Sequence, residues 1–186
     1  MKFPSVSFSH LGIHVRDMET MLVFYRDVLG LHVTDRGQLP LPGNPEIVFL
    51  SRNPAEHHQI VLVAGREDAG GSARIVNQIS FHADSLADLR SIQEALTPVA
   101  GGPTFALNHG NGWSLYSHDP EGNMLEFFVD SPWYVQQPLT DFLDLSLSDE
   151  EIHRRTEETY RSHPGFQPIE QWRAAFAERI AAERES

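Results

Sequence analysis

Three side chains far apart in the sequence have the types that bind a divalent metal: His10, Gln78 and Glu126. His10 lies in "SFSHLGIHV" and Gln78 in "VNQISFHA", and the two stretches repeat each other at an interval of 68 positions. Glu126 stands in the apolar run "NMLEFF", where an unpaired carboxylate would be costly. The arrangement that binds Fe(II) together with substrate and O₂ has two nitrogen ligands and one carboxylate, with open positions opposite.

Gln78 makes this interpretation one of several, because its amide oxygen is a harder and weaker donor toward Fe(II) than imidazole. A metal held by His10, Gln78 and Glu126 is the first option. The second is that His82, which shares a strand face with Gln78, takes the place of the ligand. The third is a metal-free cleft that binds a small aromatic molecule. Residue types alone also allow a strand histidine and a solvated carboxylate with no ligand at all.

Each half of the repeat carries the same order of predicted elements. In the first half a strand over 7–15 precedes a helix over 17–30, and β-rich runs follow at 47–51 and 58–65. The second half repeats this order, with a strand at 77–83, a helix at 85–96, and strands around the turn "DPEGN". Each half has room for one more strand. "GREDAGGSAR", residues 65–74, is the predicted connector.

After residue 130 the pattern changes to a Pro-rich arm and two predicted helices. Ser148 and Glu151 form a capping box for the first helix. The second carries an apolar stripe made by Ile169, Trp172, Phe176 and Ile180, which indicates a packing or dimer-forming face. A lid over the cleft is the alternative.

Composition excludes several classes of function. The chain of 186 residues has a net charge of −12, which disfavours nucleic acid as a partner because phosphates would be repelled. It has no cysteine, hence no disulfide and no thiolate nucleophile, and no apolar run of membrane-spanning length. We expect a cytoplasmic protein that binds neither nucleic acid nor membranes.

The stretch "SHLGIHVRDMETMLVFYRDVLGL" resembles the opening module of the vicinal oxygen chelate superfamily, which contains glyoxalase I, fosfomycin-resistance proteins and type I extradiol dioxygenases. The resemblance implies an α+β fold of two paired βαβββ modules that curl around a metal cleft. We expect this domain over residues 1–130, with module one at about 6–66 and module two at about 74–130. The arm and helices of 131–186 lie outside the resemblance.

Two further segments are similar to the extradiol branch: "FLSRNPAEHHQIVL" and "LNHGNGWSLYSHDPEGNMLEFF". On this resemblance His10, Gln78 and Glu126 match the metal ligands, with Gln78 in the place of a histidine. His58 matches the acid/base, Tyr116 the tyrosine that hydrogen-bonds the bound hydroxyl, and His109 falls near a histidine behind the ligands.

The resemblance implies a metal-dependent, ring-cleaving extradiol dioxygenase acting on a catechol-like diol. The cofactor would be Fe(II), with Mn, Zn or Ni as alternatives, and the partners a small aromatic substrate, O₂ and a second copy in a homodimer. The alternatives are a glyoxalase-like isomerase or lyase and a metal-free aromatic-binding protein. Glyoxalase chemistry uses a carboxylate from each half. The position 68 residues before Glu126 is His58, which counts against an isomerase.

Overall fold

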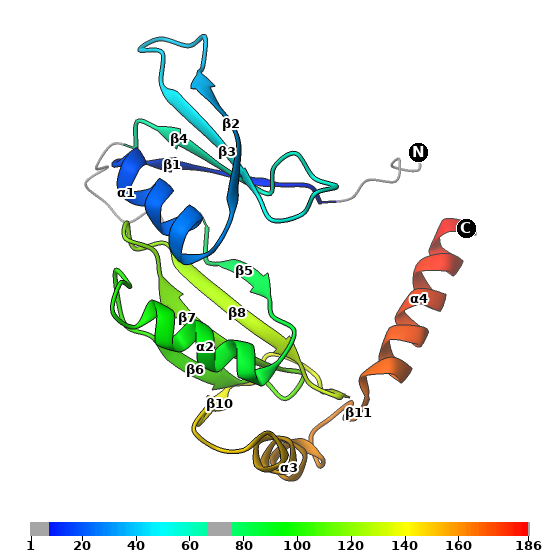
Figure 1. Cartoon of the computed structure of the whole chain (residues 1–186). Coiled ribbons are helices and arrows are strands. Elements are labelled where there is room, and N and C mark those ends of the chain that lie inside the picture. The colour runs from blue at the N-terminus through cyan, green and yellow to red at the C-terminus, as the bar shows by residue number, and fades with distance from the viewer. Residues whose placement is uncertain (1–7, 67–75, 186) are drawn as a thin grey trace. The chain divides into compact units, whose positions relative to one another are not determined.

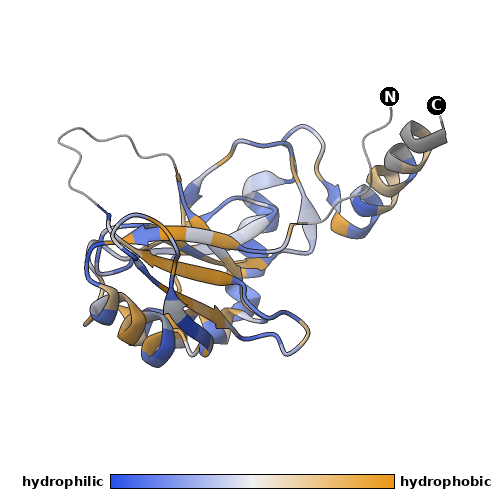
Figure 2. Cartoon of the chain, turned by 90° about the horizontal axis from the view of Figure 1, so that it is seen from above, coloured by the Kyte–Doolittle hydropathy of each residue, from blue (hydrophilic) through white to orange (hydrophobic). Residues whose placement is uncertain are grey.

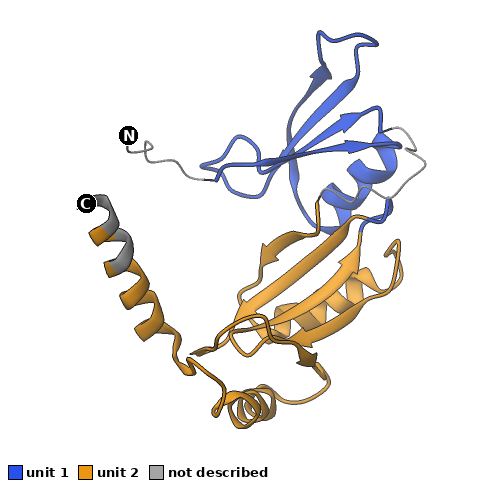
Figure 3. Cartoon of the chain, turned by 180° about the vertical axis from the view of Figure 1, so that it is seen from behind, with its two compact units in different colours: residues 1–75, 119–122 blue, residues 76–118, 123–186 orange. Residues whose placement is uncertain are grey.

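The structure is a computed structural model that describes residues 8–66 and 76–185. The chain divides into two compact units, shown in two colours in Figure 3. Unit 1 comprises residues 1–75 with 119–122, and unit 2 comprises residues 76–118 with 123–186. Each unit is described by itself below.

Unit 1 is a four-stranded sheet with a helix connecting its first two strands (Figure 1). Its elements are β1 (Leu11–Val15), α1 (Met18–Val23), η1 (Phe24–Val28), β2 (His32–Gln38), β3 (Glu46–Ser51) and β4 (Ile60–Ala64). The strand order is β1-β4-β3-β2, with β1 parallel to β4 and the other pairs antiparallel. Asp17 caps the helix by accepting a hydrogen bond from the Thr20 amide.

The helical segment of unit 1 is less regular than the sequence pattern predicts. One continuous helix is predicted over 17–30, whereas α1 gives way after Val23 to the π-helical turn η1. The chain then leaves through Gly30, whose φ of 70° is the left-handed conformation that glycine adopts most easily at a helix end. Tyr25, on η1, is fully buried, and its hydroxyl donates to Asp119 at 3.2 Å.

Unit 2 repeats this architecture. Its elements are β5 (Ile79–His82), α2 (Leu86–Leu96), β6 (Phe105–Asn108), β7 (Gly112–His118) and β8 (Met124–Asp130). The strand order is β10-β6-β7-β8-β5, in which β10 (Asp141–Phe142) comes from the tail, and β5 runs parallel to β8 as β1 does to β4. Ser85 caps α2, and the core between helix and sheet is built from Leu86, Leu89, Leu96, Leu115 and Leu125. Figure 2 shows apolar residues gathered along several of the strands. The predicted α+β architecture of two βαβββ modules is confirmed.

The tail belongs to the second unit. It contains β9 (Trp133–Tyr134), β10 (Asp141–Phe142), α3 (Asp149–Tyr160), β11 (Gln167–Pro168) and α4 (Ile169–Glu185). Ser148 caps α3 through the Glu151 amide, as predicted. From α3, Thr156 accepts hydrogen bonds from Asn108 and Trp113 at 2.9 and 2.8 Å. These buried polar contacts fasten α3 beneath the turn between β6 and β7.

The other predicted elements lie close to their observed bounds. Both first strands are shorter than predicted, so that His10 and Gln78 each stand one residue before their strand. Most of the predicted connector, residues 65–74, lies outside the described residues. None of the helices in the described ranges is both long and apolar enough to cross a membrane.

Candidate functional site

Glu126 is a buried carboxylate in the middle of β8. Only 8% of the residue is exposed, and its neighbours along the strand, Leu125 and Phe127, are apolar. Such a group is stable only when hydrogen bonds or a cation offset its lost hydration. Both carboxylate oxygens of Glu126 are hydrogen-bonded, and the three donors come from two neighbouring strands and the residue before one of them.

Two of these donors approach the Oε2 atom of Glu126 from β5 and the residue before it. The Gln78 amide nitrogen and the Ser80 hydroxyl each lie 2.5 Å from Oε2. Ser80 pairs with Glu126 in the parallel β5–β8 ladder, and Gln78 precedes Ser80 by two residues and therefore shares its face. The predicted ligands Gln78 and Glu126 are thus brought together within unit 2.

The third donor is Tyr116 on β7. Its hydroxyl donates to the Oε1 atom of Glu126 at 2.6 Å, and the two residues face each other in the antiparallel β7–β8 ladder. Burial raises the pKa of the Tyr116 phenol, and the adjacent Glu126 carboxylate raises it further. Tyr116 therefore keeps its proton at neutral pH and remains a hydrogen-bond donor.

His109 stands behind Tyr116. Its Nε2 atom lies 3.1 Å from the Tyr116 hydroxyl, and its Nδ1 atom lies 2.8 Å from the carbonyl oxygen of Leu139 in the tail. A carbonyl only accepts hydrogen bonds, so Nδ1 carries a proton. The tail therefore orients the His109 ring and fixes a proton on Nδ1, so that Nε2 is an acceptor. The single Tyr116 proton thus has two acceptors within reach, the Oε1 atom of Glu126 and the Nε2 atom of His109.

Glu126, Tyr116 and His109 line a groove of about 310 Å³ on the β7–β8 face of unit 2, whereas Gln78 and Ser80 are not among its lining residues. Its inner part is formed by His109, Ser114, Tyr116, Glu126 and Phe128, and Gln137 of the tail forms part of the wall. The volume is at the lower end of the range for small-molecule sites, and it suits a single substituted ring.

The other predicted residues lie together in unit 1. The rings of His10 and His58 are 4.1 Å apart between centroids, and Phe49 lies against His58. His57 connects to His58 through their Nδ1 atoms at 2.8 Å. Partial burial, and then the nearby rings of His10 and His57, lowers the pKa of His58. His58 is therefore neutral near pH 7 and able to accept a proton.

Strand pairing corrects the pseudo-equivalence of Glu126. The uniform interval of 68 residues assigns its counterpart to His58, whereas the ladders pair Ser80 with Glu126 and Gly12 with Val61. The counterpart is therefore Val61, because the loops before β4 and β8 differ in length. By the same ladders Phe49 is the counterpart of Tyr116. His58 stands outside β4 and has no equivalent on β8.

The donor chemistry of unit 2 fits a divalent cation in part. The Gln78 amide and Glu126 are in contact, and rotating the amide by half a turn presents its oxygen instead of its nitrogen. A carboxylate and an amide oxygen side by side suit a hard or borderline cation. Within residues 8–66 and 76–185, no three His, Asp or Glu side chains gather closely enough to hold a metal by themselves. His10 as the third ligand stays a prediction.

A match to a family model shows to which protein family the chain belongs. The model of the Glyoxalase/Bleomycin resistance protein/Dioxygenase superfamily matches residues 7–127, about two thirds of the chain. The chain belongs to this superfamily. The two βαβββ modules account for the matched region, and the tail that supplies Gln137 lies beyond it.

Curated relatives and solved structures agree with the superfamily. The chain is 28% identical over 127 residues to biphenyl-2,3-diol 1,2-dioxygenase 2 of Rhodococcus globerulus, a match that covers 67% of the chain and 63% of the relative. It is 27% identical over 139 residues to biphenyl-2,3-diol 1,2-dioxygenase 3 of the same organism, covering 73% and 68%. The chain thus matches less than two thirds of the length of the first relative.

Among solved structures, a glyoxylase/bleomycin resistance protein/dioxygenase domain from Frankia sp. EAN1pec superposes with a TM-score of 0.55 at 22% identity, covering 68% of this chain and 99% of that one. The fosfomycin resistance protein FosX of Listeria monocytogenes, complexed with Mn(II) and sulfate, superposes with a TM-score of 0.54 at 16% identity, covering 69% and 95%. These likenesses show the fold.

Two kinds of site residue were not predicted from the sequence. Ser80 was given no role, although its spacing of two residues from Gln78 was the signal for its contact with Glu126. Asn111, Asp130 and Gln137 were not identified, because no periodicity relates a turn, a strand end and a tail that meet only in the fold.

Proposed function

We propose that the protein is a metal-dependent dioxygenase of the extradiol type that opens the ring of a catechol-like diol. The observation that supports this most is the Tyr116 hydroxyl, held as a proton donor 2.6 Å from the buried carboxylate of Glu126 on an open groove. The similarity to two biphenyl-2,3-diol dioxygenases favours a vicinal aromatic diol as substrate.

His10, Gln78 and Glu126 are the residues that would hold the metal, with Fe(II) as the first choice and Mn, Zn or Ni as alternatives. When bound, the metal supplies the Lewis acidity that chelates both diol oxygens and the redox chemistry that engages O₂. The carbon–carbon bond next to the diol breaks, and both atoms of O₂ enter the ring-opened product.

The chain's own residues orient the substrate and move its protons. Tyr116 turns its single O–H from Glu126 to a diol oxygen placed next to that carboxylate, and His109, whose Nε2 atom lies 3.1 Å from the hydroxyl, keeps the Tyr116 side chain in place. Phe128 offers an apolar surface in the same groove for the aromatic ring. His58, which is neutral near pH 7, is proposed to accept the proton that the diol loses.

A metal-free binding protein is the second candidate, and one observation favours it. The three donors on Glu126 satisfy the buried carboxylate without a cation. The isomerase alternative is weaker because Val61, the structural counterpart of Glu126, is apolar and cannot act as a second carboxylate.

Oxygen uptake separates these candidates. The protein is reconstituted anaerobically with Fe(II), Mn(II), Zn(II) or Ni(II), and catechol, 3-methylcatechol or biphenyl-2,3-diol is then added with O₂. We expect Fe(II)-dependent consumption of one O₂ per diol and a coloured ring-opened product. Metal binding without oxygen uptake would favour the isomerase, and diol binding without metal would favour the binding protein.

A further inference from the structure

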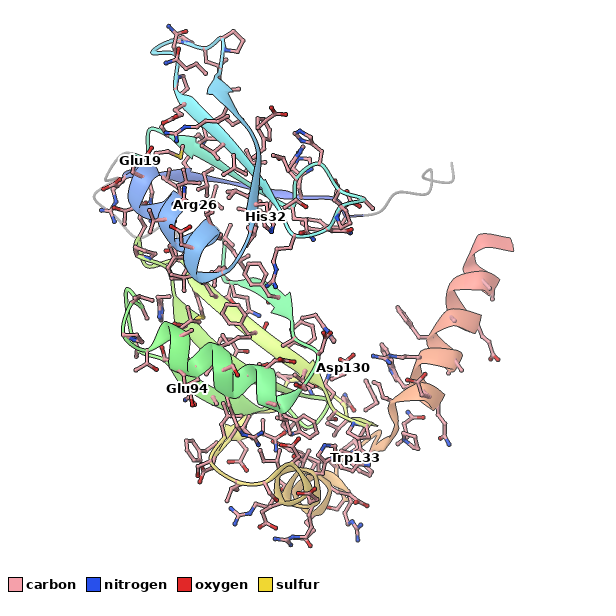
Figure 4. The ribbon with its side chains drawn as sticks, in the orientation of Figure 1. Glu19, Arg26, His32, Glu94, Asp130 and Trp133 are labelled. Atoms are coloured by element: carbon pink, nitrogen blue, oxygen red, sulfur yellow. The ribbon has the colours of Figure 1, made fainter. Side chains whose placement is uncertain are left out.

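The outer end of the groove is more polar than the floor around Phe128. Asp130 lies there, at the last residue of β8 and close to Trp133 of the tail (Figure 4). Its Oδ2 atom accepts a hydrogen bond from Arg173 of α4 at 2.6 Å and lies 3.4 Å from the Nε2 atom of His82. Within the described ranges Oδ1 makes no hydrogen bond. One carboxylate oxygen is therefore anchored, and the other is free to accept a hydrogen bond.

Asn111 lies at the same end of the groove, on the turn between β6 and β7. It is half-buried, and its side-chain amide makes no hydrogen bond to any residue that the structure describes. The neighbouring Gln137 differs, because its amide nitrogen donates to the carbonyl oxygen of His109 at 2.7 Å and its oxygen accepts from the Leu139 amide. The side-chain amide of Asn111 is thus available to bind a ligand at this end of the groove, whereas that of Gln137 is already used in hydrogen bonds within the protein.

The charge of the lining is negative. Glu126 and Asp130 both line the groove, and none of its lining residues is Lys or Arg. Arg173, the closest cation to Asp130, also bonds Glu170 and is not part of the lining. Arg173 pairs with the Oδ2 atom of Asp130 from outside the lining and offsets part of its charge. A ligand in the groove meets the Oδ1 atom, where a carboxylate would find no donor on Asp130, whereas an ammonium or hydroxyl group would find acceptors on Asp130 and on the amide oxygen of Asn111.

We infer that the groove takes an aromatic diol whose far substituent donates hydrogen bonds, and that it prefers an amine there over a carboxylate. The inference rests on the proposed function for the position of the diol, next to Tyr116 and Glu126. From that end the ring extends past Phe128, and its substituent reaches Asp130 and Asn111. Asp130 acts as the specificity residue.

Three catechols with matched two-carbon side chains test this inference: 4-(2-aminoethyl)catechol, 4-(2-hydroxyethyl)catechol and 3-(3,4-dihydroxyphenyl)propionate. Their dissociation constants are measured anaerobically by calorimetry with the full chain, and their turnover is then measured with Fe(II) and O₂. We expect the amine to bind about tenfold more tightly than the carboxylate, because the attraction of the ammonium and the repulsion of the carboxylate by Asp130 add at this partly exposed site. The hydroxyl compound should lie between them.

The variant Asp130→Asn keeps the size of the side chain and removes its charge, and should reduce the preference to less than about threefold. Asp84→Asn is the matched control, because Asp84 is exposed and does not line the groove. The control should keep the full preference. Tryptophan fluorescence and thermal unfolding of each variant establish that it is folded.

The outcomes for specificity and for reaction are separate. Equal affinity for amine and carboxylate, an unchanged preference in Asp130→Asn, or no binding of any diol would overturn the inference. If the preference is present and no diol is cleaved under any metal, the specificity stands and the dioxygenase function fails. If diols are cleaved without regard to substituent charge, the function stands and the inference fails.

Discussion

The two modules share one topology, but the side chains at four corresponding positions around Glu126 differ in chemical type. Unit 1 carries His10, Gly12, Phe49 and Val61 where unit 2 carries Gln78, Ser80, Tyr116 and Glu126. In unit 2 the four polar side chains form one hydrogen-bonded group around a carboxylate. In unit 1 the ladder positions are apolar or bare, and the polar groups lie before the strands.

This difference shows how a repeated fold can specialise its two halves. The shared ladder of parallel and antiparallel pairs fixes which positions face one another, and substitution at those positions decides whether the face is a core or a site. A valine at position 61 packs at no electrostatic cost, whereas a glutamate at position 126 needs partners on both neighbouring strands. Each hydrogen-bond donor around Glu126 in unit 2 is therefore expected to contribute to the stability of the fold.

The largest effect is expected from Glu126→Gln, which removes the charge that distinguishes β8 from β4. Diol cleavage should fall by more than about 100-fold, since even a residue that only supports a metal ligand is worth 10- to 100-fold. Glu94→Gln is the matched control, because Glu94 is exposed on α2 (Figure 4). Steady-state oxygen uptake measures both variants. Full activity in Glu126→Gln would place the chemistry elsewhere.

Tyr116→Phe makes β7 of unit 2 resemble β3 of unit 1 at position 49. We expect kcat to fall about 100-fold, because a positioned donor beside a developing charge contributes on that scale. The free energy of unfolding should fall by about 2 kcal/mol through loss of a hydrogen bond to a charged group. Tyr134→Phe, at a tyrosine that stacks on Trp172, controls for loss of a hydroxyl. An unchanged kcat would exclude Tyr116 from substrate orientation.

The third prediction concerns the paired positions 12 and 80. Ser80→Ala removes one of two donors on Glu126 Oε2 and should lower the free energy of unfolding by about 1 kcal/mol. Gly12→Ala should change it by less than about 0.5 kcal/mol or stabilise slightly, because a Cβ there meets only the Val61 Cβ at 3.9 Å. Urea unfolding of the two variants measures the contrast. Equal effects would mean that Ser80 supports nothing that Gly12 lacks.

How much of this was predictable from the sequence depends on the kind of signal. The modules followed from the repeat, because "SHLGIHV" and "NQISFHA" keep the period-2 pattern that a half-buried strand requires. That Gln78 and Glu126 come together followed from the resemblance to the superfamily, which matches both to metal ligands, and not from the repeat. The counterpart of Glu126 was wrong because a uniform interval ignores loop length, and only strand register identifies Val61.

The outer groove was beyond prediction for a different reason. Asn111 lies in a turn, Asp130 ends a strand, and the tail wall at Gln137 lies outside the superfamily match. A residue such as Asn in a turn is already explained by its preference for turns, so the sequence gives no sign that it also lines a groove. The predicted homodimer, the cytoplasmic location and the roles of His10 and His58 remain predictions.

The smallest effect is expected in the titration of His58, in unit 1. Its pKa should lie below the ordinary histidine value, because burial and the rings of His10 and His57 disfavour the imidazolium. Since the unfolded chain binds this proton more readily, His58 destabilises the fold as pH falls below about 6.5. His10→Ala should raise the pKa of His58 toward its ordinary value, as followed by NMR titration. A pKa unmoved by that substitution would contradict the contact.

Iron retention tests most directly whether Gln78 and Glu126 form a metal-binding pair. The wild-type protein, Gln78→His, Glu126→Gln and the control Gln93→His are purified without chelators, loaded anaerobically with Fe(II), dialysed and submitted to elemental analysis. We predict that Gln78→His retains the most iron, because imidazole is the better donor, and that Glu126→Gln retains the least, with Gln93→His equal to wild type. Equal iron content in all four proteins would contradict the account.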